Sequence, residues 1–340
     1  MKRALLGMTL TELQDVAQEL GQPKYRAQQI AEWLYQKGAA SFEEMTNLSK
    51  AMREQLSERY EVGRHAPAVT QVSKDGTEKY LFPLHANPNL KYETVYIPDG
   101  KRATLCVSSQ VGCKMNCSFC ATGKMGFQTQ LSATDIINQM LSVPHSDLLT
   151  NVVFMGMGEP LDNYEEVARA LEIMTASYGF AWSPRRITVS TIAPKRGLLR
   201  LLEEQEVHVA VSLHSPFSEE RLSLMPVEQA FPIEEVLDTL GRYDFSGQRR
   251  LSFEYILLDG VNDSPRHAEA LVRLLKPLDC RVNLIPYHAI PDIPLRPSPK
   301  EQIERFEEYL TSRGIRATTR RSRGQDIFAA CGMLSTIQGK

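Results

Sequence analysis

From about residue 103 onward, the chain alternates between short apolar runs and longer amphipathic stretches, and this rhythm limits the possible folds more than any other feature. The short runs are typical of buried strands, and the stretches between them are typical of helices. Strands and helices that alternate at this spacing form βαβ units, so they predict an α/β fold with a mostly parallel sheet. The expected strands are 104–107, 151–155, 186–189, 207–211, 251–257, 281–285 and 315–319, and the expected helices are 134–143, 163–177, 196–203, 232–242, 265–275 and 300–312.

A partial (βα) barrel is the expected architecture of this region. Its length of roughly 230 residues suits a barrel, and the glycine fingerprint of a dinucleotide-binding fold is missing from the sequence. Residues 103–340 are therefore expected to form one unit, a partial barrel followed by a C-terminal catalytic segment. The stretch from Pro286 to Pro299 contains three further prolines, which predicts a long irregular loop that could serve as a lid.

The first 102 residues divide into two parts. Residues 1–65 have helical periodicity, and the first helix is expected to begin at Thr9, a capping residue followed three positions later by Glu12. Residues 66–102 alternate apolar and polar side chains, which is typical of strands, and we interpret them as a linking β segment. The chain is thus expected to join a small helical domain, a β segment and a barrel. The helices expected in the first part are 9–20, 25–37 and 50–60.

Three of the six cysteines form the pattern Cys113-x3-Cys117-x2-Cys120 directly after an expected strand. The spacing is too tight for a disulfide framework. Three thiolates on one short loop can bind a 4Fe-4S cluster and leave one iron without a protein ligand. Structural zinc is the alternative, but it needs four ligands, and the sequence lacks a second cysteine pair. The loop therefore predicts a 4Fe-4S cluster whose open iron binds the amino and carboxylate groups of S-adenosylmethionine (SAM).

Charge and hydropathy narrow the classes of function. A formal net charge of −2 argues against a globally basic nucleic-acid binder. A group of arginines near the C-terminus fits either a solvated face or a rim that contacts phosphates, and both readings stay open. The sequence has no apolar run of the roughly 20 residues that span a membrane, and we expect a cytoplasmic location. The arginines are Arg313, Arg316, Arg320, Arg321 and Arg323.

Three longer strings make the sequence recognisable: residues 104–113 (TLCVSSQVGC), 156–160 (GMGEP) and 323–332 (RGQDIFAACG). With the cysteine loop, they resemble the radical-SAM superfamily and, within it, the RlmN/Cfr family of RNA adenine methyltransferases. The resemblance covers nearly the whole chain. It implies methylation of carbon 2 of an adenosine in the peptidyl-transferase centre of 23S rRNA and of adenosine 37 in tRNAs. It also implies one 4Fe-4S cluster, two SAM molecules per turnover, and an N-terminal domain (1–65) that helps to bind RNA.

The resemblance implies roles for three catalytic residues. Cys331 accepts a methyl group from one SAM, and this S-methyl group adds to adenine after a radical from the second SAM removes one of its hydrogens. Such a route suits C2, an electron-poor carbon, because a thiolate accepts a methyl group readily. Cys106 closes a transient disulfide with Cys331 as the product leaves, and Glu93 accepts the C2 proton. Without the resemblance, Glu93 would be interpreted as an exposed strand residue, and Cys331 and Cys280 as small buried hydrophobic residues.

Seven positions at or just beyond the carboxyl ends of expected strands match the family's SAM contacts, and barrel enzymes build their sites at this edge. One position departs from the family pattern, since better-known members have asparagine where this chain has His288. His214 and His288 can also be interpreted as satisfied core or loop histidines. The expected SAM contacts are Gly158, Glu159, Ser190, Ser212, Leu213, His214 and His288.

Two other functions stay open at this point. A Cfr-type enzyme uses the same cysteines to methylate C8 of adenine, so the motifs separate the two poorly. A non-catalytic protein that binds RNA through a metal-containing fold would explain the cysteine loop but would leave Cys106 and Cys331 without a role. The expected partners are 23S rRNA, tRNA and a flavodoxin or ferredoxin that donates electrons, and the chain is expected to act as a monomer without contact to a membrane.

Overall fold

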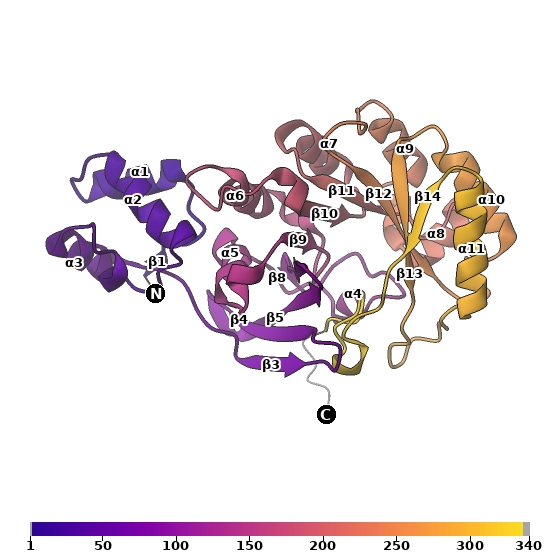
Figure 1. Ribbon diagram of the computed structural model, residues 1–340, viewed down its shortest axis with the longest axis horizontal. Coiled ribbons are helices and arrows are strands. Elements are labelled where there is room, and N and C mark those ends of the chain that lie inside the picture. The colour runs from indigo at the N-terminus through magenta and orange to yellow at the C-terminus, as the bar shows by residue number, and fades with distance from the viewer. Residues whose placement is uncertain (1, 336–340) are drawn as a thin grey trace.

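A ten-stranded sheet organises the computed structural model, which describes residues 2–335 (Figure 1). Its strand order is β14-β13-β12-β11-β10-β9-β6-β5-β4-β3. From β6 to β14 all neighbours are parallel and follow each other in chain order. With right-handed crossovers, this order places the connecting helices on one face, as in a barrel. The parallel strands are β6 (Arg102–Cys106), β9 (Asn151–Phe154), β10 (Ile187–Thr191), β11 (His208–Ser212), β12 (Leu251–Leu257), β13 (Cys280–Pro286) and β14 (Arg316–Thr319).

The expected α/β fold and partial barrel are confirmed. Within the described residues, β14 and β6 do not pair with each other, so the barrel stays open. Each expected strand and helix of this region is present, and its ends lie within two residues of the expected ones. No helix or strand lies between Pro286 and Lys300, as the prolines predict. The crossover helices are α5 (Ala133–Ser142), α6 (Tyr164–Thr175), α7 (Lys195–Glu204), α8 (Ser218–Leu224), α9 (Ile233–Leu240), α10 (Pro265–Leu275) and α11 (Lys300–Ser312).

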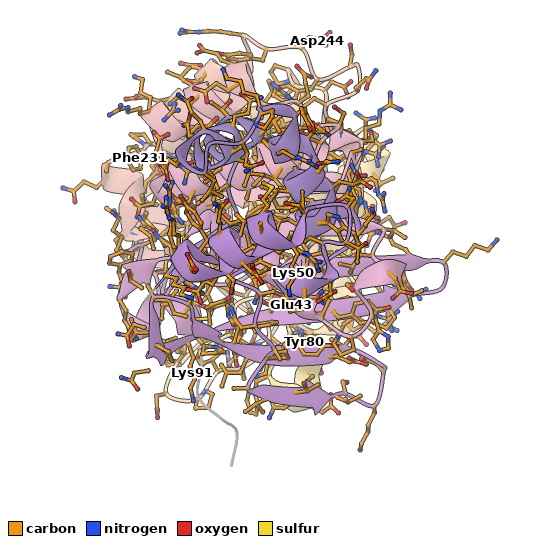
Figure 2. The ribbon with its side chains drawn as sticks, turned by 90° about the vertical axis from the view of Figure 1, so that its left-hand side faces the viewer. Glu43, Lys50, Tyr80, Lys91, Phe231 and Asp244 are labelled. Atoms are coloured by element: carbon orange, nitrogen blue, oxygen red, sulfur yellow. The ribbon has the colours of Figure 1, made fainter. Side chains whose placement is uncertain are left out.

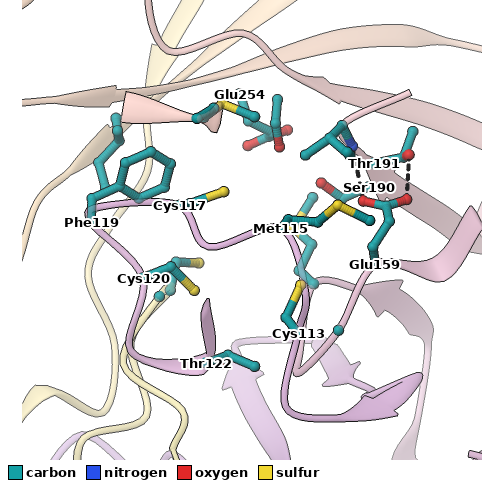
Figure 3. A pocket seen from close by; sticks show the side chains of 18 of the residues that line it. Cys113, Met115, Cys117, Phe119, Cys120, Thr122, Glu159, Ser190, Thr191 and Glu254 are labelled. Carbon is teal, nitrogen blue, oxygen red and sulfur yellow. Dashed lines mark hydrogen bonds between the residues drawn. The ribbon is translucent and has the colours of Figure 1, made fainter. Parts of the chain in front are cut away.

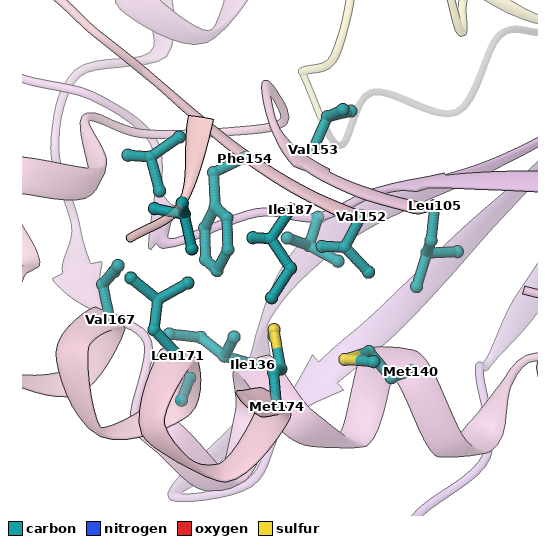
Figure 4. Close-up of a cluster of buried hydrophobic side chains, with 14 of the residues drawn as sticks. Leu105, Ile136, Met140, Val152, Val153, Phe154, Val167, Leu171, Met174 and Ile187 are labelled. Carbon is teal, nitrogen blue, oxygen red and sulfur yellow. The ribbon is translucent and has the colours of Figure 1, made fainter. Parts of the chain in front are cut away.

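The main core lies between the parallel strands and the crossover helices. Figure 4 shows the part where α5 and α6 cover the first strands, with apolar side chains from both layers facing one another. Phe154 of β9 and Ile187 of β10 are at most 1% exposed, and so are Ile136 of α5 and Leu171 of α6. Burial of such a side chain stabilises the fold by about 1.5–3 kcal/mol. This packing holds the carboxyl ends of the strands in a fixed relation to one another.

Three antiparallel strands extend the sheet beyond β6. They are β3 (Val69–Val72), β4 (Glu78–Leu84) and β5 (Asn87–Asp99), and β5 pairs directly with β6. The segment 66–102 is therefore continuous with the barrel sheet. The connection from β6 to α5 also contains a short pair of strands, β7 (Gln110–Val111) and β8 (Thr129–Gln130), and a short helix, α4 (Ala121–Met125), which the apolar pattern does not predict.

A small helical module forms the N-terminal part of the structure and lies at one end of the molecule (Figure 1). Its first helix begins as expected, since Thr9 and Glu12 form a capping box. Figure 2 shows Glu43 and Lys50 on this module, which carries acidic and basic side chains alike. No helix within residues 2–335 is long and apolar enough to cross a membrane. The module contains β1 (Arg3–Ala4), α1 (Leu10–Glu19), α2 (Tyr25–Ala31), α3 (Lys50–Arg59) and β2 (Tyr60–Glu61).

The segment that follows β14 runs back to the antiparallel strands, where Figure 1 shows it beside β3, β5 and α4. Several hydrogen bonds attach it there. The backbone N–H of Gly324 donates to Asp75 at 3.0 Å, and the Thr122 hydroxyl donates to the carbonyl of Leu334 at 2.6 Å. Because Cys331 lies between these two attachments, the C-terminal segment is held over the carboxyl edge of the barrel.

Candidate active site

The loop that carries Cys113, Cys117 and Cys120 is built by local turns between β7 and α4. Gly112 adopts φ +73°, and a Cβ atom there would lie only 1.8 Å from the carbonyl oxygen of Gly126, so the two ends of the loop approach each other more closely than a side chain allows. The N–H of Ser118 donates to the carbonyl of Leu224 at 2.8 Å and fixes the middle of the loop to the barrel. All three cysteines are free thiols that line one pocket.

These three thiols fit an iron–sulfur cluster. Burial raises the pKa of Cys113 to about 12 and also raises the pKa values of Cys117 and Cys120, and the neighbouring thiols add to each rise. The positive charge of bound metal ions would lower these pKa values and favour the thiolate form of all three. No group of three or more possible ligands within residues 2–335 is arranged around a single ion. Three cysteines on one short loop suit a cubane, in which each thiol binds a different iron, whereas structural zinc needs four ligands.

The pocket beside this loop opens at the carboxyl edge of the barrel, where Figure 3 shows the three cysteines facing Glu159, Ser190 and Glu254. Expected site residues from several separate segments line it. The structure therefore brings together most of the side chains that the sequence selects. The expected residues that line the pocket are Cys113, Cys117, Cys120, Gly158, Glu159, Ser190, Ser212, His214 and Cys331.

Glu159 is held in a fixed orientation inside the pocket. Its carboxylate accepts hydrogen bonds from the Thr191 hydroxyl and from the backbone N–H groups of Leu161 and Ile192, the latter two at 3.0 Å. Burial raises the pKa of Glu159 to about 7, although these hydrogen bonds oppose the rise. A carboxylate in such a place is suited to receive the ammonium group of an amino acid.

Gly158 precedes Glu159, and the backbone at this position leaves no room for a side chain. It adopts φ +97°, and a Cβ atom would lie 2.5 Å from the Cβ of Gln110 and 2.8 Å from its backbone nitrogen. We expect Gly158→Ala to lower the free energy of unfolding, measured in urea, by about 1–3 kcal/mol more than Gly100→Ala does. Gly100 is a matched control because it also has a positive φ, +59°, but its chain neighbours aside, a Cβ atom there would meet nothing within 4 Å. Equal losses in the two variants would show that crowding at Gly158 does not matter.

His214 is both a satisfied buried histidine and a pocket residue. Its Nδ1 accepts the N–H of Ile256 at 3.0 Å, and its ring packs against that of Phe119 in a T-shaped arrangement with centroids 4.8 Å apart. Burial, followed by the nearby Arg221, lowers the pKa of His214 to about 3, so the ring stays neutral. It can contribute hydrogen bonds and shape to the pocket but no charge.

Leu213 and His288 do not line this pocket. The Leu213 side chain is fully buried in the main core. His288 lies in the loop after β13, where its ring is 2.8 Å from the Ser322 hydroxyl and accepts from the Gln325 amide at 3.0 Å. The loop-histidine interpretation therefore describes His288 in this structure, because these contacts turn it towards the C-terminal segment.

The three expected catalytic residues lie around the C-terminal segment. Cys331 is exposed to the pocket, so the buried-hydrophobe interpretation is wrong for it, whereas Cys280 is buried. Cys106 ends β6, and burial raises its pKa to about 12, with a further rise from the nearby Cys331. Glu93 is 3% exposed, so its interpretation as an exposed strand residue is wrong. Its carboxylate accepts the backbone N–H of Ser335 at 2.9 Å.

Sequence reasoning missed Glu254, a pocket residue on β12. It is 3% exposed, and its Oε2 atom accepts no hydrogen bond from the described residues. A charged residue inside the apolar run 251–257 was a signal, because carboxylates are rarely buried without a role. Arg320 lies 3.8 Å from this carboxylate and turns inward, which separates it from the rest of the arginine group.

The arginine group is not a continuous rim. Arg316 pairs with Asp279, and Arg323 pairs with Asp99 at 2.9 Å. Arg313 lies over the ring of Tyr309 at 5.3 Å. These exposed contacts fit the solvated-face interpretation for three of the five residues.

Comparisons with known proteins agree with this geometry. The family profile of the ribosomal RNA large subunit methyltransferase N-terminal domain matches residues 3–62, and that of the radical SAM superfamily matches residues 107–273. A curated relative from Parabacteroides distasonis, named probable dual-specificity RNA methyltransferase RlmN, is 58% identical over 337 residues, which cover 99% of this chain and 98% of the relative.

Two further relatives extend the comparison. The dual-specificity RNA methyltransferase RlmN of Marinobacter nauticus is 42% identical over 340 residues, covering 97% of this chain and 92% of the relative. The crystal structure of a radical SAM methyltransferase from Sphaerobacter thermophilus is 43% identical and superposes with a TM-score of 0.92 over 98% of this chain and 99% of that one. The likeness therefore extends over the helical module, the barrel and the sheet that joins them.

Proposed function

This chain belongs to the RlmN family of radical-SAM RNA methyltransferases, and we propose that it methylates carbon 2 of adenosine in both 23S rRNA and tRNA. The observation that carries the proposal is one pocket that contains both the three-cysteine loop and Cys331. A cluster alone would need only the loop. An exposed fourth cysteine beside it, on a separate segment, supports a reaction in which a methyl group rests on the protein before it reaches RNA.

Cys113, Cys117 and Cys120 would hold the 4Fe-4S cluster, and Gly158, Glu159, Ser190, Ser212 and His214 would bind SAM beside it. When bound, the cluster and SAM supply an electron, a methyl group and a 5′-deoxyadenosyl radical. The protein residues orient the cofactor and keep water away from it. Among them, Glu159 would receive the SAM ammonium group with a carboxylate that backbone donors already hold in place. Leu213 and His288 do not line the pocket, so we propose that they contact SAM only through their backbone or support the residues that do.

Three residues act on the methyl group and the adenine. The Cys331 thiolate accepts the methyl group and later bears the carbon that joins adenine. Glu93 takes the proton from C2 of that covalent adduct. Cys106, whose pKa is raised by burial and by the nearby Cys331 thiol, then forms a disulfide with Cys331 as the carbon–sulfur bond breaks. The proximity of the two thiols supports this pairing, although both are free in this structure.

The alternatives are less well supported. The curated relatives carry the dual-specificity RlmN name rather than that of a C8 methyltransferase, so the Cfr-type function is not favoured. A non-catalytic RNA-binding protein leaves Cys106 and Cys331 unexplained. We further propose that the enzyme acts as a monomer in the cytoplasm, where rRNA and tRNA are made. A flavodoxin or ferredoxin would supply the low-potential electron that radical-SAM chemistry needs.

Analysis of modified nucleosides tests the proposal. We expect RNA hairpins from the peptidyl-transferase centre and whole tRNAs, incubated anaerobically with the cluster-loaded enzyme, SAM and a reductant, to yield 2-methyladenosine. Mass spectrometry after digestion to nucleosides would identify the product against authentic standards. A yield of 8-methyladenosine would instead establish the C8 activity, and an absence of both products would contradict the proposed function.

A further inference from the structure

Glu93 forms a buried ion pair with Lys79. The Nζ atom of Lys79 on β4 lies 3.0 Å from an Oε atom of Glu93 on β5, and the two side chains are 5% and 4% exposed. Glu93 stands opposite Leu81 in the ladder, so Lys79 reaches it diagonally across the two strands. Among residues 2–335, this is the only ion pair that Glu93 makes. A lysine with so little exposure is uncommon unless it is paired.

The other groups that contact Glu93 are neutral. The backbone N–H of Ser335 donates to its second carboxylate oxygen at 2.9 Å. The Met157 sulfur accepts the Glu93 N–H at 3.3 Å, and the Ser108 hydroxyl donates to the Glu93 carbonyl at 2.6 Å. Within the described residues, Lys79 therefore supplies the positive charge that contacts this carboxylate, while the loops after β6 and β9 and the C-terminal segment contribute only uncharged groups.

The C-terminal segment covers Glu93 in this structure. Besides the Ser335 contact, the carbonyl of Phe328 accepts from Lys79 at 3.5 Å, and Leu334 lines the pocket. Ser335 belongs to this terminal segment, whereas Lys79 belongs to the sheet, and the register of β4 on β5 fixes its place beside the Glu93 carboxylate.

We propose that Lys79 is a positioning residue that keeps Glu93 ionised and oriented while it accepts the C2 proton; this rests on the proposed function. A buried carboxylate without a cation binds a proton far more readily. A protonated Glu93 cannot act as a base. In the step concerned, the C2–H bond of the adduct breaks, its proton passes to a Glu93 oxygen, and the electron pair of the bond stays on the adenine ring. Lys79 itself does not touch the substrate.

The test is release of the covalent protein–RNA adduct by the full-length, cluster-loaded enzyme. We expect Lys79→Met to produce 5′-deoxyadenosine and S-methylated Cys331 like the wild type, but to release the adduct about 10- to 100-fold more slowly at pH 7. Raising the pH should restore release, because the Glu93 carboxyl group then ionises without its partner. Lys79→Arg, which keeps the charge, should release the adduct at a rate close to that of the wild type.

Cys106→Ala is the matched control, since it removes the thiol that frees Cys331 and should retain the adduct at every pH. If neither it nor the Lys79 variants form an adduct, the proposed function fails. If Cys106→Ala retains the adduct while Lys79→Met releases it at the wild-type rate at pH 7, the role of Lys79 is overturned. Lys79→Gln is a second variant, with the same expected result, should Lys79→Met not fold. Failure of Lys79→Arg to release the adduct would equally contradict the inference.

Discussion

Replacement of Cys331 by alanine is expected to abolish RNA methylation, with a loss of at least about 10³-fold. Under the proposed mechanism, Cys331 carries the methyl group, so no other group can take over its role. The substitution removes one sulfur atom from an exposed position, and its effect on stability should stay within about 0.5 kcal/mol. The cluster, bound by other cysteines, and the binding of SAM should both survive.

The measurement is anaerobic turnover, in which methylated RNA and 5′-deoxyadenosine are quantified in the same reaction. The variant should contain normal iron and form no methylated RNA. Cys280→Ala is the matched control, because Cys280 is buried on β13 and has no proposed role, so this variant should keep its RNA methylation. Methylation that persists in Cys331→Ala would rule out the covalent route and leave only the family assignment.

The strands and helices of the barrel could be predicted from the sequence because the pattern that indicates each one lies within that element. The run 251–257 is strand β12 with the same bounds, and 265–275 and 300–312 are helices α10 and α11. Period and turn chemistry are enough to find such elements. The three cysteines of the loop are local as well, since their spacing alone brings them to one pocket. Strand order then places Ser190 and Ser212 at the same edge.

Lys79 and Glu254 could not be selected in this way. Lys79 meets Glu93 only because of the register of β4 on β5, and Glu254 faces the pocket only because β12 lies between β11 and β13. The apolar run around Glu254 marks that residue as unusual, but which groups it and Lys79 meet depends on long-range strand pairing, which no pattern within one strand specifies. The same dependence on long-range contacts explains why the sequence did not place His288 correctly, since its partners belong to a segment more than thirty residues away.

Cys117→Ala is expected to remove the cluster and, with it, every chemical step. Cys117 is the middle ligand of the loop, and its thiol is buried beside Cys113 and Cys120. Two cysteines cannot hold a cubane that is meant to have three protein ligands. We expect the variant to lose most of its iron and to form neither 5′-deoxyadenosine nor methylated RNA. A loss this complete differs from that of Cys331→Ala, which should keep the cluster.

The whole mechanism depends on three cysteines that hold a 4Fe-4S cluster with one iron open to SAM. Electron paramagnetic resonance of the anaerobically isolated, reduced wild-type protein tests this most directly, with Cys117→Ala as the control without a cluster. We predict the signal of one 4Fe-4S cluster per chain and a clear change in that signal when SAM is added. A protein that contains zinc, or a cluster signal that SAM leaves unchanged, would contradict this mechanism.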